Sequence, residues 1–510
     1  MFVTNVLAAI ACLLLLRFYL HFKNIYRYWQ NRGLKVIEPI YFPFGNFWTF
    51  IKRDKGVGPI LAEWYEEVDS EVIGLYALNE PILLVKDPDI IRDILVKDFN
   101  SFTDRGVYMD KNDSLTGQLW KLPGHKWKPL RTKMSTCFTI GKLKMMFSNL
   151  LNAGEEMEIF LEKAAAAESI DVDDLCKRFT ADIVAQSIFG VEVKSFKDKD
   201  NDFLKMLKCL TTGFNRKNMI KFSLQIVAPK FYDFFSFVKF ETVNQVAISF
   251  VYKMVEKIME FREATGAVGK DMMQLLIQLK KFGKVDAENG EKLPDSDVCL
   301  TMDEVVAQAY TYFFTGSETA SSTLTLLLYE CSLNQDIQRK VQEDIDKALS
   351  SSGGQITYEA ILEMKYLNMV VSETLRKYPI LQFLMRKSVE DYKLEKIGLE
   401  LEKGTRIYIS VQGLQRDPKY YPDPEKFDPE RFSKENQANR HPMTYMPFGE
   451  GPRNCIGKRL GYFMVVVGAI HIFRNFNLST FEDIEVPLKL NPYSYTIRPV
   501  NPLLLKVSQR

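Results

Sequence analysis

A glycine-rich loop at residues 448–457 (FGEGPRNCIG) limits the possible folds of this chain more than any other segment. Glycine accepts backbone conformations that other residues resist, so its glycines allow a tightly turned loop. Several backbone N–H groups can then point at the sulfur of Cys455 and lower the pKa of its thiol. Arg453 adds a fixed positive charge two residues away, suited to a carboxylate. The loop therefore predicts a fold that holds one ionised sulfur beside one bound acid.

A lone cysteine of this kind is compatible with few metal sites. No second cysteine or histidine stands near Cys455 in the sequence, which argues against zinc and iron–sulfur sites because these need several ligands. One thiolate does suit the axial position of haem iron. The alternative is a small buried cysteine in a glycine-rich turn, the commoner fate of a lone cysteine.

The spacing within this loop resembles that of a known family. The pattern F-x-x-G-x-R-x-C-x-G marks the haem-binding loop of the cytochrome P-450 monooxygenases, and this chain fills it with Phe448, Gly451, Arg453, Cys455 and Gly457. The resemblance implies a mainly α fold with a smaller β-sheet region behind an N-terminal membrane anchor. It also implies haem b as cofactor, contacted by Phe448 and Arg453 and bound through its iron to Cys455.

Composition excludes several other classes of protein. A chain of 510 residues with 46% hydrophobic residues can bury a large core, and no linker or repeat divides it. A formal net charge of +2 gives no general attraction to nucleic acid. The seven cysteines are odd in number and scattered, which argues against a disulfide framework and for a reducing compartment. We expect one catalytic domain over residues 47–510.

The N-terminal segment predicts a membrane anchor over residues 1–22. Residues 6–16 are unbroken apolar sequence, and the apolar character continues to residue 22, about the length that crosses a bilayer as one helix. A cleaved signal peptide is the alternative, but no positive segment precedes the run and no small-residue cleavage site follows it. The basic residues after it place the rest of the chain in the cytosol: Lys23, Arg27, Arg32 and Lys35. Residues 23–46 then form a linker with a proline-containing hinge, and the resemblance implies the endoplasmic reticulum membrane.

Periodicity predicts a few strands around a helical body. Residues 72–78 and 81–85 are typical of a hairpin, and Asp87-Pro88 opens a short helix. The pattern is then mostly helical to residue 349, and strands return at 399–401 and 406–411.

A long helix is expected from residue 301 to about 332. Thr301 and Glu304 form a capping box at its start. The segment 315–319 (TGSET) weakens the helix in its middle, which favours a ligand groove there or a close contact between helices. It resembles the family pattern A/G-G-x-D/E-T-T/S, which implies that Glu318 and Thr319 deliver protons in catalysis. Thr315 and Ala320 depart from that pattern, and the added hydroxyl of Thr315 changes the polarity of the pocket.

The sequence E-x-x-R at Glu373 and Arg376 places two opposite charges on one helix face. Taken alone it is a weak signal, because exposed pairs of this spacing are common and contribute little to stability. The resemblance implies that Arg431 joins them in a buried network on the proximal side of haem. Such a network stabilises the fold rather than catalysing.

Three further residues are expected to bind the cofactor. Trp127 and Arg131 match the family's W-x-x-x-R helix, whose two residues meet haem propionates, and Arg386 stands where another propionate-binding arginine is usual. Arginine suits carboxylates in a pocket of low dielectric constant because it binds them with two hydrogen bonds. Core packing is the alternative for Trp127.

The sequence gives less information on which residues contact the substrate. Three segments at 111–120, 381–384 and 491–495 correspond to substrate-recognition segments of the resembled family, and the expected pocket residues are Leu115, Leu119, Trp120, Thr315, Phe383 and Tyr493. The aromatic stretch 222–240 either dips into the bilayer to admit lipophilic substrates or forms an ordinary amphipathic helix.

The resemblance implies insertion of one oxygen atom of O₂ into small lipophilic substrates. No dinucleotide fingerprint appears, so NADPH and flavins are expected only through a partner NADPH–cytochrome reductase, with cytochrome b5 as a second partner. The segments 102–108 and 138–147 resemble the insect microsomal group linked to clearing plant toxins and insecticides. The alternatives are a dedicated hormone, steroid or fatty-acid hydroxylase, an O₂-independent haem isomerase and a haem sensor without turnover.

Overall fold

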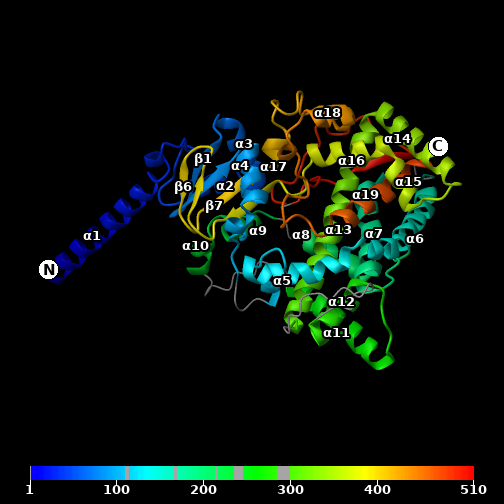
Figure 1. The fold of residues 1–510 in the computed structure, drawn as a ribbon, viewed down its shortest axis with the longest axis horizontal. Helices are drawn as coiled ribbons and strands as arrows, with labels where there is room; N and C mark the ends of the chain where they lie inside the picture. Colours follow the sequence, from blue (N-terminus) through cyan, green and yellow to red (C-terminus); the bar gives the residue numbers. More distant parts are fainter. Residues whose placement is uncertain are drawn as a thin grey trace.

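The computed structural model describes residues 2–109, 114–165, 169–198, 200–212, 215–234, 245–283, 299–494 and 496–510. Helices make up most of these residues, and part of the strands gather at the side of the molecule that carries the N-terminal helix (Figure 1). This confirms the expected fold class. Some segments with an expected substrate or membrane contact lie outside the described residues: 111–113, 235–240 and 495.

The largest sheet has four strands in the order β1-β2-β7-β4. The expected hairpin is present as β1 (Val72–Ala77) and β2 (Glu80–Val85), with Glu80 in the strand rather than in the turn. β7 (Arg406–Ser410) runs parallel to β2, and β4 (Phe383–Lys387) runs antiparallel to β7. The sequence did not predict β4, because it lacks an alternation of apolar and polar residues.

Two smaller sheets complete the strand content of the described residues. β3 (Ser169–Asp171) and β8 (Phe476–Ser479) flank β9 (Leu504–Gln509), and β5 (Tyr392–Leu394) pairs with β6 (Leu399–Leu401). The expected strand at 399–401 is therefore confirmed, and its partner is β5.

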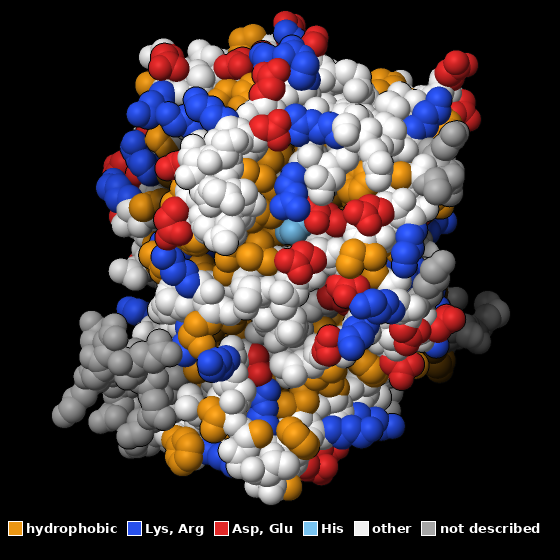
Figure 2. Space-filling model, turned by 90° about the vertical axis from the view of Figure 1, so that its right-hand side faces the viewer, with side chains coloured by type: hydrophobic (Ala, Val, Ile, Leu, Met, Phe, Trp, Pro, Cys, Tyr) orange, Lys and Arg blue, Asp and Glu red, His pale blue; other side chains and the backbone are white. Residues whose placement is uncertain are grey.

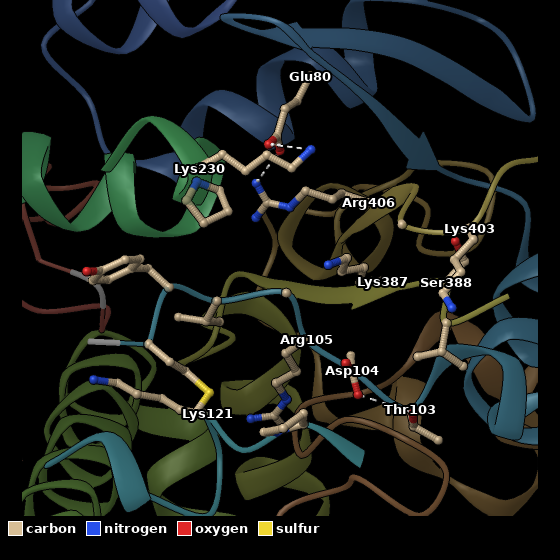
Figure 3. A pocket seen from close by; sticks show the side chains of 18 of the residues that line it. Glu80, Thr103, Asp104, Arg105, Lys121, Lys230, Lys387, Ser388, Lys403 and Arg406 are labelled. Atoms are coloured by element: carbon tan, nitrogen blue, oxygen red, sulfur yellow. Dashed lines mark hydrogen bonds and ion pairs between the residues drawn. The ribbon is translucent and has the colours of Figure 1, made fainter. Parts of the chain in front are cut away.

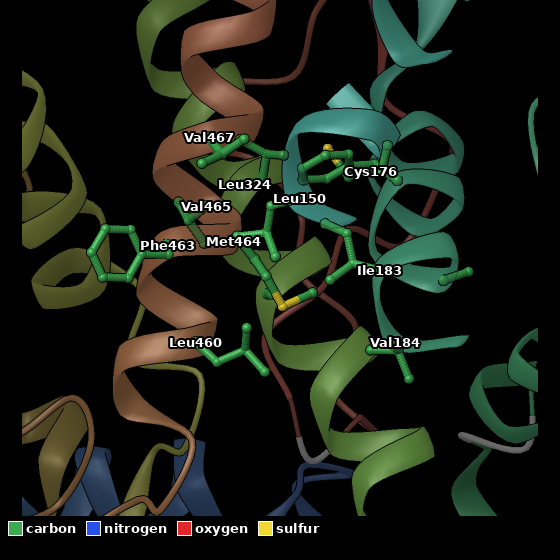
Figure 4. Close-up of a cluster of buried hydrophobic side chains, with 14 of the residues drawn as sticks. Leu150, Cys176, Ile183, Val184, Leu324, Leu460, Phe463, Met464, Val465 and Val467 are labelled. Carbon is green, nitrogen blue, oxygen red and sulfur yellow. The ribbon is translucent and has the colours of Figure 1, made fainter. Parts of the chain in front are cut away.

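The helical body packs around the long helix α13 (Met302–Leu333), beside which α6 (Ile140–Ala165), α7 (Val172–Val184) and α19 (Lys458–Phe473) bury apolar side chains (Figure 4). Gly468 of α19 permits this closeness, because a Cβ there would collide with Leu324. The other helices of eight or more residues are α3 (Val57–Glu67), α5 (Gly124–Ser135), α8 (Asp202–Thr212), α9 (Arg216–Val227), α11 (Gln245–Thr265), α12 (Met272–Phe282), α14 (Gln335–Ser351) and α16 (Lys365–Lys377). The shorter α-helices are α2 (Phe47–Lys52), α4 (Pro88–Arg92), α10 (Pro229–Phe234), α15 (Tyr358–Glu363), α17 (Val411–Gln415) and α18 (Lys434–Ala438).

The capping box at the start of α13 is confirmed. The Thr301 hydroxyl accepts from the Glu304 backbone N–H at 3.2 Å, and Glu304 Oε2 accepts from the Thr301 backbone N–H at 2.9 Å. α13 ends at Leu333, one residue beyond the expected end, and most of its side chains are buried. It therefore crosses the interior of the helical body.

The N-terminal helix α1 (Phe2–Ile25) extends away from the rest of the molecule (Figure 1). Its apolar stretch has a mean hydropathy of 2.0 and no buried residues, so it is a candidate membrane anchor by length and composition. At 1.5 Å per residue it is about 36 Å long, enough to span the hydrocarbon core. Tyr26, which directly follows the helix, contacts the sheet, and its ring lies 5.3 Å from that of Tyr76 in β1.

The surface charge is mixed in sign. On the face shown in Figure 2, basic and acidic side chains alternate without a large field of one sign. The mixed charge of this face agrees with the near-zero formal net charge.

Candidate functional site

The loop around Cys455 has the tight turns that its glycines suggest. Gly449 and Gly451 have φ values of 67° and 74°, in the left-handed region that favours glycine. A Cβ at Gly451 would also collide with the backbone carbonyl of Leu95. The Cys455 backbone N–H donates to the Phe448 carbonyl at 2.9 Å and closes the loop.

Cys455 faces a space inside the molecule. Protein surrounds it on all sides, yet its own surface is accessible. Burial raises the pKa of its thiol, and the Gly457 N–H and the guanidinium groups of Arg131 and Arg105 lower it only in part. The prediction of a lowered thiol pKa is therefore wrong for the protein alone, because removal from water outweighs the nearby donors. No cluster of three metal-ligating side chains occurs in the described part of the chain, so Cys455 would serve as a single ligand.

The middle of α13 presents a row of threonine hydroxyls. Thr311, Thr315, Thr319 and Thr323 follow at four-residue spacing, and each donates its hydroxyl proton to the carbonyl one turn earlier, at 2.6–2.8 Å. Thr315 is exposed although the helix around it is mostly buried, so it also borders an interior space. Because each proton is used by a carbonyl, the row offers oxygen lone pairs to that space.

Tyr312 connects α13 with the cysteine loop. Burial, followed by the neighbouring Cys137 thiol, holds the pKa of Tyr312 well above its usual value, and Cys455 acts in the same direction. The interaction with Cys455 places the middle of α13 next to the loop. The Tyr312 hydroxyl is buried and has no hydrogen-bond partner in the described structure. The expected pocket residue Thr315 therefore lies one helical turn from Tyr312, whose pKa Cys455 helps to raise.

Glu318 does not share a face with Thr319. Its side chain is 3% exposed and binds the C-terminal segment, where Arg498 contacts both carboxylate oxygens, at 2.7 Å from Nη2 to Oε2. Thr496 Oγ1 donates to Oε1 at 2.9 Å. Neighbouring residues on a helix point about 100° apart, which explains the divergence. Sequence reasoning missed Arg498 and Thr496, because nothing local marks residues that pack against a helix far away in the chain.

Four arginines converge beside the cysteine loop. Arg131, Arg386 and Arg453 were expected there, and Arg105 joins them. Burial, followed by repulsion from its neighbours, lowers the pKa of Arg453 to about 9 and that of Arg105 to about 10. The Arg386 pKa is lowered well below its usual value for the same reasons. Such mutual repulsion calls for a bound anion.

The arginine nitrogens also leave room for that anion. Nε and Nη1 of Arg453 and Nε of Arg386 are buried without a hydrogen-bond partner. Arg453 is held in place from behind, by the Trp127 ring 4.5 Å from its guanidinium and by a bond to the Leu122 carbonyl at 2.6 Å. Trp127 therefore positions an arginine. Sequence reasoning missed Arg105 as a member of this arginine cluster. The signal that could have found it is its positive charge within the segment 102–108.

The E-x-x-R residues meet Arg431 as the resemblance implies. Both nitrogens of the Arg376 fork donate to Glu373, Nε at 2.7 Å and Nη2 at 2.8 Å. Arg431 Nε lies 3.5 Å from Glu373 Oε1. Glu373 and Arg376 are completely buried, and Arg376 also bonds the Gln415 and Pro424 carbonyls. Because it joins α16 to the segment before the cysteine loop, this network can stabilise the fold.

Comparison with known proteins gives the family that the sequence motifs resemble. A sequence model described as Cytochrome P450 matches residues 39–507. The chain belongs to the cytochrome P450 family. It is 36% identical over 492 residues to Probable cytochrome P450 6d4 of Drosophila melanogaster, covering 94% of each chain. It is 37% identical over 491 residues to Cytochrome P450 6k1 of Blattella germanica, covering 93% of this chain and 92% of that one.

The family implies haem, and the site residues fit it. The thiol of Cys455 faces an interior space and would ligate the iron, which takes up the sulfur as the thiolate. Two propionates would supply the negative charge that the four arginines lack, and the unpartnered nitrogens of Arg386 and Arg453 provide donors for them. Haem of this type, when bound, supplies the activation of O₂.

The expected substrate residues fall into two groups. Leu115 and Leu119 are buried in the core cluster beside α13. Leu115 has no exposed surface, so its side chain packs within this cluster. The backbone there is fixed to α13 by Gln308, which accepts from the Leu119 N–H and donates to the Gly117 carbonyl. Trp120 is half-buried nearby, its indole N–H bonded to Gln118 at 2.6 Å.

The structure shows the immediate neighbours of Phe383 and Tyr493, whose role as pocket residues stays a prediction. The Phe383 ring meets that of Tyr408 at 6.0 Å, in the cluster between the sheet and α3, while its strand neighbour Leu384 faces Gly449 of the cysteine loop. Alternation along a strand explains this, because Leu384 and Arg386 share one face of β4. The Tyr493 hydroxyl donates to Asp54 at 2.6 Å near the molecular surface.

Proposed function

We propose that this protein is a haem-thiolate monooxygenase that inserts one oxygen atom of O₂ into lipophilic substrates, including plant toxins and insecticides. The observation that carries the proposal is the interior space itself. We infer it from the accessible sulfur of Cys455, the exposed Thr315 in the middle of α13 and the buried arginine nitrogens without hydrogen-bond partners. The insect relatives support the detoxifying role, since the segments that resemble the insect microsomal group lie within the matched region.

The residues of the chain have separable roles in this proposal. Cys455 anchors the cofactor, and the arginine cluster orients it through its acidic groups. Thr319 and Thr315 present acceptor oxygens toward the space and can hold a water molecule there. The Glu318 carboxylate is bound by Arg498 and Thr496. No hydrogen bond joins Glu318 to Thr319 among the described residues, so Glu318 would take part in proton delivery when its contact with Arg498 opens.

Electrons would come from NADPH through a membrane-bound NADPH–cytochrome reductase, with cytochrome b5 as a second donor. The docking surface would be basic and near the cysteine loop, formed by Lys126, Lys133, Lys142, Lys144, Lys458 and Arg459. Lys458 supports this position, because its Nζ lies 5.6 Å from the centre of the Phe448 ring. Lys144 is already paired with Glu359 at 2.8 Å, so it would contribute less.

The enzyme would be held in the endoplasmic reticulum membrane by α1, with the catalytic domain in the cytosol. The basic residues that follow the apolar helix support this orientation, because positive residues are retained on the cytosolic side. The interior space lies in the body of the protein and would receive substrates that partition into the membrane.

The test is a spectrum followed by product analysis. Membranes containing the full chain should show, after reduction and addition of carbon monoxide, the absorption band that gives the family its name, and a Cys455→Ser variant should lack it. With NADPH and reductase, isotopically labelled O₂ should appear as one oxygen atom in products from a panel of lipophilic toxins. A missing band in folded protein, or products without label, would contradict the proposal. Preference for one steroid or fatty acid over the toxins would favour a dedicated hydroxylase.

A further inference from the structure

A second cavity opens beside the arginine cluster. It has a volume of about 1200 Å³ and lies between the segment 103–109, the start of α10 and the ends of β4 and β7 (Figure 3). Basic side chains outnumber acidic ones on its walls, with Arg105, Lys121, Lys230, Lys387, Lys403 and Arg406 against Glu80 and Asp104. Arg105 marks its inner end, where the cofactor site begins. We call the outer part, between Lys230, Lys387, Lys403 and Arg406, the basic groove.

The basic groove contains a buried cation with a free donor. Arg406 is 4% exposed and donates to the Val227 carbonyl at 2.7 Å and to the Tyr408 hydroxyl at 3.0 Å, but its Nε has no hydrogen-bond partner. Glu80 lies 3.6 Å from Arg406 and 3.3 Å from Lys230, so one carboxylate serves two cations (Figure 3). Within the described residues, no carboxylate lies in ion-pair range of Lys387 or Lys403. An anion in the groove would therefore complete the charge balance.

The rim of the groove is tied to the chain that leaves the membrane helix. α1 ends at Ile25, and three and seven residues later Tyr28 and Arg32 bond Glu402 Oε1, at 3.1 Å and 2.7 Å. Glu402 directly precedes Lys403, and its carbonyl accepts from Ser388 at 2.9 Å. The rim of the groove thus lies next to the segment that directly follows the candidate membrane helix.

We propose that the basic groove binds the phosphate headgroup of an anionic phospholipid in the membrane that α1 enters. Lysine ammonium groups and an arginine N–H are the usual donors to phosphate oxygens, and the cytosolic leaflet offers anionic lipid at this position. A soluble phosphate ester has the same chemistry, but the contact between the rim and the juxtamembrane segment favours the lipid. The inference rests on the proposed membrane anchoring and is independent of the proposed oxygen insertion.

The experiment uses full-length holoprotein in a non-ionic sugar detergent, with binding followed by titration calorimetry. The three ligands are a short-chain phosphatidic acid, the matching phosphatidylcholine and glycerol 3-phosphate. The test variant is Lys387→Gln with Lys403→Gln. The control is Lys205→Gln with Lys434→Gln, which removes the same charge from exposed positions away from the groove.

Phosphatidic acid should bind more tightly than either other ligand. The groove variant should lose about tenfold or more in affinity, from two lysines that each attract an anionic lipid, and added salt should weaken binding. The control should keep the wild-type affinity, and both variants should keep the carbon monoxide band. Equal binding of phosphatidylcholine, equal loss in the control, or glycerol 3-phosphate binding as tightly as the lipid would overturn the assignment. Loss of the band in the wild type would instead count against the proposed function.

Discussion

The ion pair between Glu318 and Arg498 gives the sharpest test of how this site is built. Glu318 is 3% exposed and Arg498 6% exposed, and Arg498 reaches both carboxylate oxygens. Asp173 lies 3.7 Å from Nη1 of Arg498 on its other side. Replacing Arg498 by methionine keeps much of the side-chain volume but leaves Glu318 in the interior with only the Thr496 hydroxyl as a partner.

Removing one partner of a buried pair costs about 3–5 kcal/mol, because the remaining charge has neither water nor a counter-charge. We expect that loss for Arg498→Met. Glu318→Gln should cost less, about 1–3 kcal/mol, because Asp173 still faces Arg498. The double variant Glu318→Met with Arg498→Met should cost clearly less than the sum of the two single methionine variants, since no charge is left alone.

The assay is urea unfolding of the full-length holoprotein, followed by the carbon monoxide band and by circular dichroism. Matched measurements on Lys205→Gln, an exposed change on α8, give the baseline for an unrelated substitution. If Arg498→Met is as stable as the wild type, or if the double variant loses the full sum, the pair does not stabilise the protein as its geometry indicates. Product formed per NADPH consumed should fall in Glu318→Gln, because the proposed proton delivery needs the carboxylate, while substrate binding should not change.

Three further expectations concern other parts of the fold. Gly451→Ala should abolish the carbon monoxide band, because its positive φ adds about 1–3 kcal/mol of strain and its Cβ meets the Leu95 carbonyl, whereas Gly141→Ala, with open space around it, should keep the band. Glu373→Gln should leave little holoprotein, since the buried Arg376 and the partly buried Arg431 lose their counter-charge at about 3–5 kcal/mol, and a normal yield of spectrally intact protein would contradict this. Burial raises the pKa of Asp344, so its ionised form opposes folding: the group's stabilising contribution is present in acid and is lost as pH rises through the folded pKa. Asp344→Asn should therefore be more stable than the wild type at neutral pH, with the difference closing in acid, and a constant difference across pH would refute it.

Motifs with fixed local spacing were predicted well. The capping box of α13, the hairpin of β1 and β2 and the helix after Asp87 depend on contacts within a few residues, so the residue types alone indicate them. The same holds for the apolar helix α1, whose helical part runs three residues beyond the expected anchor. The arginine set was found for Arg131, Arg386 and Arg453, because the family resemblance assigns each of them.

The direction of individual side chains could not be read from the sequence. Phe383 was expected in the pocket, and β4 turns it toward Tyr408 because strand alternation sends Leu384 and Arg386 the other way. Tyr493 was expected there as well, and its hydroxyl is held by Asp54. The ionisation of Cys455 was misjudged because desolvation depends on all the surrounding protein and not on the loop alone.

The sequence by itself determined the family, and it indicated the ligand atom and the anchor, because each depends on residue types at short spacing along one segment. Only the tertiary structure decided that Arg498 restrains Glu318, that Arg105 joins the arginine cluster and that a basic groove opens beside the juxtamembrane chain. The physical reason is that these contacts join residues far apart in the chain. Their charge balance depends on which groups packing brings together and on how much water it leaves between them.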